Sequence, residues 1–187
     1  MNIPNWLSLF RIVLIPVCVI VYYLPFKWAY LSAAAIFVIA ALTDWLDGYL
    51  ARKWGQTTPF GAFIDPVADK LIVMAALTVL VESHANAWLT IPAIIIVGRE
   101  IVISALREWM AEIGKRASVA VSVIGKYKTA AQMVAIAVLL SHPPGTLLVT
   151  IGLVVLQVAA LLTIWSMFVY LKAAWPDLSP YKDEKST

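Results

Sequence analysis

Apolar segments long enough to cross a lipid bilayer recur along the whole chain, and they restrict its fold more than any other feature. A hydrocarbon core roughly 30 Å thick needs about 20 apolar residues in a helix. Such stretches lie at about 6–26, 28–50, 66–82, 87–110, 119–140 and 146–171. With 62% hydrophobic and only 13% charged residues, the 187-residue chain is too apolar for an ordinary soluble domain. We therefore expect an all-α integral membrane protein with six transmembrane helices in a single domain, residues 1–187.

The basic residues predict the orientation of these helices. Segments that stay in the cytoplasm carry an excess of Lys and Arg. If the N-terminus is cytoplasmic, Lys27 is the only basic residue in the outer turns. An even number of spans then places both termini in the cytoplasm. This basic inner face suits a surface rich in anionic lipid, and no nucleic-acid-binding module is present. Cys18 is the only cysteine, which excludes an internal disulfide and a thiolate metal site.

Aspartates gather at the cytoplasmic side of the second and third expected helices. Asp44 and Asp47 lie about 60° apart on one helical face. Asp65 and Asp69 stack at i, i+4 near the start of the third helix, with Pro66 in its first turn. A charge at membrane depth costs about 2.5 to 3.5 kcal/mol, so the cluster needs compensating cations. Carboxylates from two adjacent helices suit Mg²⁺ or Mn²⁺, and we expect two ions together with a diphosphate substrate.

Small and polar residues accompany the aspartates. Gly48, Ala51 and Arg52 continue the face of the first pair, and Thr58 and Gly61 lie in the segment that leads into the third helix. Small side chains would leave room for a nucleotide lying against the helices. The alternative is that they let the helices pack closely, as small residues commonly do in membranes.

The complete stretch resembles the signature of the CDP-alcohol phosphotransferase family at every fixed position: Asp44-x2-Asp47-Gly48-x2-Ala51-Arg52-x8-Gly61-x3-Asp65-x3-Asp69. Three other segments, NIPNWLSLFRI, GREIVISALREWMAEIGKR and GKYKTAAQM, resemble bacterial members that use glycerol 3-phosphate as acceptor. The resemblance to this family therefore extends over most of the chain. The resemblance implies a homodimeric transferase of phospholipid biosynthesis in the bacterial inner membrane, with its active site facing the cytoplasm.

The resemblance also implies a reaction and residue roles. The 1-hydroxyl of sn-glycerol 3-phosphate would attack the lipid-side phosphorus of CDP-diacylglycerol, giving phosphatidylglycerophosphate and CMP. By position, the metal ligands would be Asp44, Asp47, Asp65 and Asp69, and Asp69 would also be the catalytic general base. The residues that would bind CDP-diacylglycerol are Asn5, Ser8, Gly48, Ala51, Arg52, Thr58 and Gly61. For Asn5 and Ser8, helix capping is an alternative role.

Basic residues of the fourth and fifth helices are candidates for binding the acceptor's phosphate. Arg99 lies in an apolar run beside Glu100, and ionisable groups inside a membrane are functional-site candidates. We assign the acceptor pocket to Arg99, Arg107, Lys126 and Lys128. The alternative is an Arg–Glu network that only holds the helices together.

Three other functions share parts of this pattern. The same motif would serve a transferase with another acceptor, namely inositol phosphate, serine or a second phosphatidylglycerol. A membrane prenyltransferase also uses aspartate-rich helices with Mg²⁺, but it needs more spans. A cation transporter would distribute its acidic groups through the membrane, whereas here they gather on one side.

Overall fold

The computed structural model describes residues 3–54, 58–114 and 123–178, apart from the side chains of residues 3, 4, 45, 47, 49–52, 54, 123–127 and 176–178. These residues form only helices and turns. In chain order the helices are α1 (Ile3–Tyr23), α2 (Ala29–Trp54), α3 (Pro59–His84), α4 (Ala87–Glu112), α5 (Val123–Ser141) and α6 (Leu147–Leu178). The all-α prediction is therefore confirmed for the part of the chain that the structure describes.

Three helices are long and apolar enough to cross a membrane, judged over their described residues. They contain the stretches Asn5–Tyr23, Ala87–Glu112 and Leu147–Trp175. The apolar parts of α2 and α5 are shorter, Ala29–Asp44 and Lys128–Ser141. The chain is thus a helical membrane protein by its composition, and the count of six spans stays a prediction.

The third helix begins earlier than the sequence predicted. We expected it near residue 66, but α3 begins at Pro59. Thr58 caps it with an extended backbone and accepts a hydrogen bond from the Gly61 amide, and proline is favoured at the first helical position. Pro66 consequently lies inside α3, so its placement in the first turn was wrong. Asp65 and Asp69 lie beyond that turn.

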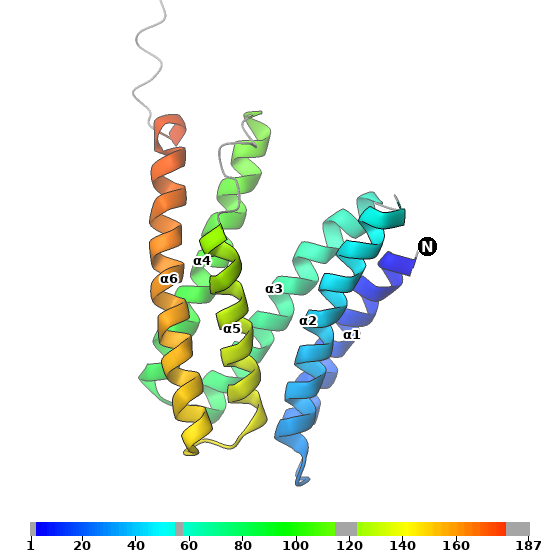
Figure 1. Ribbon diagram of the computed structural model, residues 1–187, viewed down its shortest axis with the longest axis vertical. Helices are drawn as coiled ribbons and strands as arrows, with labels where there is room; N and C mark the ends of the chain where they lie inside the picture. The colour runs from blue at the N-terminus through cyan, green and yellow to red at the C-terminus, as the bar shows by residue number, and fades with distance from the viewer. Residues whose placement is uncertain (1–2, 55–57, 115–122, 179–187) are drawn as a thin grey trace, which may run out of the picture.

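The helices form two groups that meet along the middle of the molecule. α1, α2 and α3 lie on one side and α4, α5 and α6 on the other (Figure 1). α5 packs against both α6 and α2, and α3 packs against α4. The first turn of α1 and the last turn of α6 lie at the same end of the bundle (Figure 1), which agrees with an even number of crossings.

The core is apolar and rich in small side chains. Alanines such as Ala33, Ala40 and Ala76 are buried and let neighbouring backbones approach closely. Phe37 and Leu80 fill the space between them. Large apolar side chains are also exposed on the outer faces, Ile94, Leu161 and Phe168 among them. Such outward apolar surface is expected of helices in contact with lipid.

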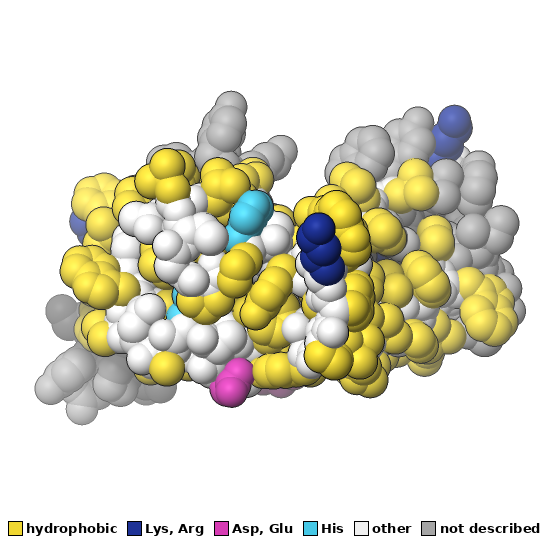
Figure 2. Space-filling view, turned by 90° about the horizontal axis from the view of Figure 1, so that it is seen from below, with side chains coloured by type: hydrophobic (Ala, Val, Ile, Leu, Met, Phe, Trp, Pro, Cys, Tyr) yellow, Lys and Arg dark blue, Asp and Glu magenta, His cyan; other side chains and the backbone are white. Residues whose placement is uncertain are grey.

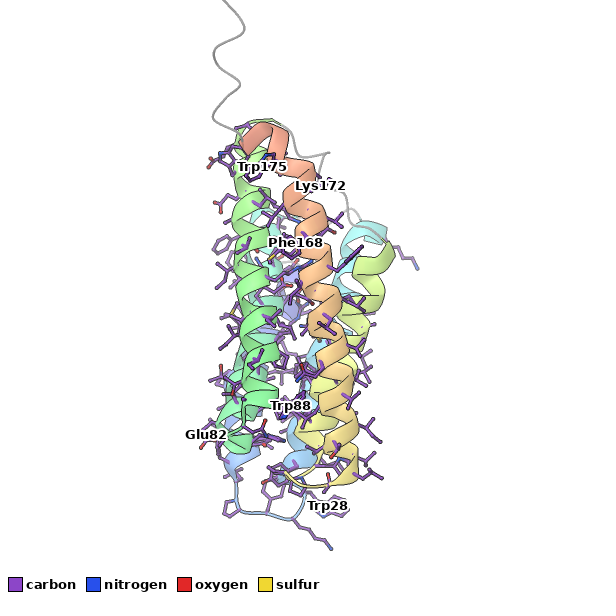
Figure 3. The ribbon with its side chains drawn as sticks, turned by 90° about the vertical axis from the view of Figure 1, so that its left-hand side faces the viewer. Trp28, Glu82, Trp88, Phe168, Lys172 and Trp175 are labelled. Atoms are coloured by element: carbon purple, nitrogen blue, oxygen red, sulfur yellow. The ribbon has the colours of Figure 1, made fainter. Side chains whose placement is uncertain are left out.

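The two ends of the bundle differ in character. The end opposite the two termini shows mostly hydrophobic side chains and few charged ones (Figure 2). Trp28 and Trp88 lie near that end, whereas Trp175 and Lys172 lie near the other (Figure 3). Tryptophan near both ends is typical of residues at the two membrane interfaces.

Candidate functional site

Arg11 joins two of the predicted aspartates. Its side chain is fully buried in α1, and its Nη1 atom donates hydrogen bonds to Oδ1 of Asp44 at 2.8 Å and to Oδ1 of Asp69 at 2.5 Å. Asp44 comes from α2 and Asp69 from α3. The prediction that carboxylates of these two helices come together is therefore confirmed for this pair, and the link between them is a residue of a third helix.

Beside this pair, two hydrogen bonds connect α1 to α3 and its cap. We call their four residues, Asn5, Ser8, Thr58 and Asp65, the polar seam. The Ser8 Oγ donates to Oδ1 of Asp65 at 2.5 Å, and the Thr58 Oγ1 donates to Oδ1 of Asn5 at 2.8 Å. Asn5 and Ser8 are both buried and lie inside α1, past its first residue. These two bonds cross between helices and do not satisfy amides of α1, so they give both residues a role other than capping.

Gly61 makes this close approach of α1 and α3 possible. A Cβ atom at position 61 would lie 3.0 Å from Oδ1 of Asn5 and 3.3 Å from Oγ1 of Thr58. A contact of 3.0 Å is tighter than nine in ten real Cβ contacts, so an alanine would displace the hydrogen-bonded side chains of Asn5 and Thr58 by a few tenths of an ångström. For Gly61, the structure therefore favours the packing explanation of the small residue.

A cavity of about 420 Å³ opens between the two groups of helices. Asp44 and Asp69 line one side of it, and Arg99 and Arg107 of α4 line the other. Its other polar lining residues are Arg11, Lys70, Glu100, Thr129, Gln132 and Tyr170. The structure thus brings two of the predicted acceptor-binding arginines to the same cavity as two of the predicted metal ligands.

Three basic residues of α4 and α5 lie close together. Arg99 donates from Nη1 to Oε1 of Glu100 at 2.5 Å, and both residues belong to α4. Lys128 on α5 is only 1% exposed, and its Nζ has no hydrogen-bond partner among the described residues. Arg99 and Arg107 repel the Lys128 ammonium, and Glu100 attracts it. Because a buried ammonium is costly without a partner, this arrangement favours an anion-binding role.

The donor atoms fit a hard divalent cation. Asp44 and Asp69 present carboxylate oxygens from different helices to one positive charge, the chemistry that Mg²⁺ and Mn²⁺ require. Over the described side chains, no three His, Cys, Asp or Glu residues form a group able to hold a metal. Asp47 lies outside the described side chains, so the predicted set of four carboxylates stays a prediction.

Several predicted residues cannot be placed in this geometry. The side chains of Ala51, Arg52 and Lys126 lie outside the described part of the structure, as Asp47 does, and Gly48 contributes only its backbone in α2. Sequence reasoning missed Arg11, Gln132 and Tyr170 as residues of the site.

A signal for Arg11 was present in the sequence. Asn5, Ser8 and Arg11 follow each other at intervals of three, which places them along one face of a helix. Three polar residues on one face of an otherwise apolar helix indicate that this face meets polar partners.

Comparison with known proteins identifies the family of the chain. The chain matches the family model for CDP-alcohol phosphatidyltransferase over residues 1–169. It is 61% identical over 178 residues to the CDP-diacylglycerol–glycerol-3-phosphate 3-phosphatidyltransferase of Sodalis glossinidius (strain morsitans), which covers 95% of this chain and 97% of the relative. Proteins with the same name in Pseudomonas fluorescens and Yersinia pestis (strain Pestoides F) are 55% and 58% identical, over 95% of this chain and 92% and 97% of the relatives. The resemblance inferred from the motifs is thus confirmed, and the chain belongs to the CDP-alcohol phosphatidyltransferase family.

Proposed function

We propose that this chain transfers the phosphatidyl group of CDP-diacylglycerol to the 1-hydroxyl of sn-glycerol 3-phosphate, releasing phosphatidylglycerophosphate and CMP. Relatives 55–61% identical over most of the chain carry the name of this reaction. The structural observation that carries the proposal is the shared cavity, in which Asp44 and Asp69 face the same space as Arg99 and Arg107. One side of that space suits a bound cation and the other an anionic acceptor.

Asp69 is the proposed catalytic residue. Its carboxylate is 45% exposed and lines the cavity. In the proposed step the acceptor's 1-hydroxyl oxygen forms a bond to the lipid-side phosphorus, the bond from that phosphorus to the CMP oxygen breaks, and Asp69 takes the hydroxyl proton. CMP leaves with the electron pair of the broken bond. The chain itself forms no covalent intermediate.

The metal ligands in this proposal are Asp44, Asp47, Asp65 and Asp69, holding two Mg²⁺ or Mn²⁺ ions. When bound, such ions offset the negative charge of the diphosphate and polarise the bond to the leaving group. Ser8 holds Asp65 in place through its 2.5 Å hydrogen bond. Orientation of a ligating carboxylate by a hydrogen-bonded neighbour is a common requirement of metal sites.

The two substrates bind on different sides of the aspartates in this proposal. Near α1 and the junction of α2 with α3, CDP-diacylglycerol contacts Asn5, Ser8, Gly48, Ala51, Arg52, Thr58 and Gly61. Arg52 pairs with the diphosphate, because a guanidinium binds phosphate oxygens in a bidentate manner. The phosphate of the acceptor binds among Arg99, Arg107, Lys126 and Lys128.

We also propose six transmembrane spans with both termini in the cytoplasm, in a bacterial inner membrane and as a homodimer. The scarcity of charged side chains at the end opposite the termini supports this orientation (Figure 2). The aspartate cluster would then face the cytoplasm. The homodimer rests on the family resemblance.

The decisive experiment measures CMP release from CDP-diacylglycerol by the purified protein in detergent. Release should require both Mg²⁺ and glycerol 3-phosphate, and mass spectrometry should identify phosphatidylglycerophosphate as the lipid product. Offering inositol phosphate, serine and phosphatidylglycerol in competition tests the alternative acceptors. A cation transporter would release no CMP under any of these conditions.

Two variants test the catalytic role of Asp69 in the same assay. Asp69→Asn should abolish turnover while the protein remains folded in the membrane. Glu82→Gln is the matched control, since Glu82 lies at the opposite end of the bundle (Figure 3). Near-wild-type turnover by the Asp69 variant would reject the role assigned to that carboxylate.

A further inference from the structure

Arg11 occupies an unusual electrostatic position. Its side chain has 0% exposure, whereas the Asp44 and Asp69 side chains bonded to it are 40% and 45% exposed. Burying a guanidinium is costly unless it is paired and hydrogen-bonded. A single nitrogen of Arg11, Nη1, donates hydrogen bonds to both carboxylates, so the pair compensates the cost of burying the guanidinium.

The two carboxylates would repel each other without a shared cation. Like charges that converge on one place raise the free energy of the folded chain, and they do so more strongly in a bundle of low dielectric constant. Arg11 removes this repulsion from inside the chain. The proposed function assigns the same two carboxylates to a divalent ion, so the guanidinium and the ion compete for their negative charge.

We propose that Arg11 is an internal counter-charge that holds Asp44 and Asp69 together before a divalent ion binds and yields their oxygens when it does. Arg11 is thus a positioning residue with two effects. It lets α1, α2 and α3 assemble when the ion is absent, and it lowers the affinity of the site for the ion. The inference rests on the divalent-ion site of the proposed function.

Removal of the charge separates these two effects. Arg11→Gln keeps a polar side chain but loses the cation. In EDTA this variant should unfold at a lower temperature than the wild type, because the carboxylates then repel each other. With Mn²⁺ it should bind the ion at least about fivefold more tightly, the lower end of the usual range of coupling between sites. Its stabilisation by Mn²⁺ should therefore exceed that of the wild type.

The measurements are Mn²⁺ binding, followed by the electron paramagnetic resonance signal of the free ion, and thermal unfolding in EDTA and in Mn²⁺. Neither readout depends on catalysis. Arg11→Lys keeps the charge and should stay within about fivefold of the wild-type Mn²⁺ affinity. Lys172→Gln removes a positive charge from the exposed surface of α6 and should change neither readout.

The outcomes distinguish this inference from the proposed function. Equal or weaker Mn²⁺ binding by Arg11→Gln, or an equal loss of stability in EDTA and in Mn²⁺, would overturn the counter-charge and leave the metal site standing. Failure of the wild type to bind Mn²⁺ would instead remove the metal site itself. If Arg11→Gln folds in neither condition, Arg11→Lys carries the test, and a change in its Mn²⁺ affinity beyond about fivefold overturns the inference.

Discussion

Ser8 on α1 donates a hydrogen bond to Asp65 on α3, with 2.5 Å between Oγ and Oδ1. Ser8 is 1% exposed, so this hydroxyl belongs to the interface of the two helices. A short bond to a carboxylate restricts the directions in which that carboxylate can point. The N-terminal helix therefore takes part in arranging the aspartates, although none of the motif aspartates lies on it.

This bond predicts that Ser8→Ala lowers turnover by about 10- to 100-fold, the usual cost of losing a group that orients a metal ligand. Ser8→Thr keeps the hydroxyl and should retain most of the activity. CMP release at saturating substrate measures both variants. Activity of the alanine variant equal to that of the threonine variant would show that the orientation of Asp65 does not depend on this bond.

Gly61→Ala should disrupt the seam between α1 and α3. The new methyl group would lie 3.0 Å from Oδ1 of Asn5, so the Asn5 side chain has to move away from its hydrogen bond with Thr58. Forcing an extra carbon into a packed interface typically costs about 1 to 3 kcal/mol. We expect a lower unfolding temperature together with reduced CMP release.

Gly98→Ala is the matched control for this substitution. Gly98 lies inside α4, and a Cβ added there meets nothing within 4 Å. Alanine in place of glycine inside a helix stabilises it by up to about 1 kcal/mol. Its unfolding temperature should therefore be unchanged or higher. An equal fall in both variants would indicate a general intolerance of alanine and contradict the steric argument at Gly61.

The sequence predicted the helices and the meeting of two of them, for clear physical reasons. A bilayer demands apolar helices of about 20 residues, so candidate helices can be recognised and ordered from the sequence alone. The period of a helix places Asp65 and Asp69 on one face whatever surrounds them. These features depend on residues close together in the chain, and the convergence of Asp44 with Asp69 follows once α2 and α3 are known to be neighbours.

The contribution of α1 could not be predicted in the same way. Which face of an apolar helix meets a neighbour depends on packing between helices, and the exposed face of α1, with Trp6, Val13 and Ile20, is itself apolar. The contacts of Arg11 with Asp44 and Asp69 depend on residues 33 and 58 positions away in the chain. The start of α3 was also missed, because Thr58 caps the helix and a proline occupies its first turn.

Lys128→Met should stabilise the ligand-free protein and weaken binding of the acceptor. Lys128 is buried with no hydrogen-bond partner for Nζ among the described residues, and an apolar side chain of similar length removes a buried charge that lacks a hydrogen bond. Replacing buried charges with apolar groups can stabilise a protein by roughly 1 to 4 kcal/mol. We expect a higher unfolding temperature and at least a tenfold higher KM for glycerol 3-phosphate.

The control for this variant is Lys172→Met, which removes an exposed lysine of α6 and should change neither quantity. The KM for CDP-diacylglycerol should stay near the wild-type value in both proteins. A Lys128 variant that is less stable, with an unchanged KM for glycerol 3-phosphate, would assign Lys128 a structural role and remove it from the acceptor pocket.

Arg107→Gln should weaken binding of the acceptor in the cavity that Arg107 shares with the aspartates. Arg107 is exposed, yet it lines the same space as Asp69, so it can reach a small anion bound there. Loss of a charge-assisted hydrogen bond costs about 1.5 to 3 kcal/mol, which corresponds to a KM for glycerol 3-phosphate raised by roughly 10- to 150-fold. Steady-state kinetics with each substrate varied in turn will show whether the effect is confined to the acceptor.

The proposed orientation predicts which loops a membrane-impermeant reagent can reach. In a Cys18→Ala background, Lys27→Cys places a thiol in the turn between α1 and α2, and Glu112→Cys places one at the last residue of α4. Cys18 is buried and is the only cysteine of the chain, so its removal leaves these two thiols as the only targets. In intact spheroplasts a charged maleimide should label the thiol at position 27 and spare the one at position 112, because the basic end of the bundle faces the cytoplasm. Both should react after lysis, and labelling in the opposite order would place the aspartate cluster outside the cell and contradict a cytoplasmic active site.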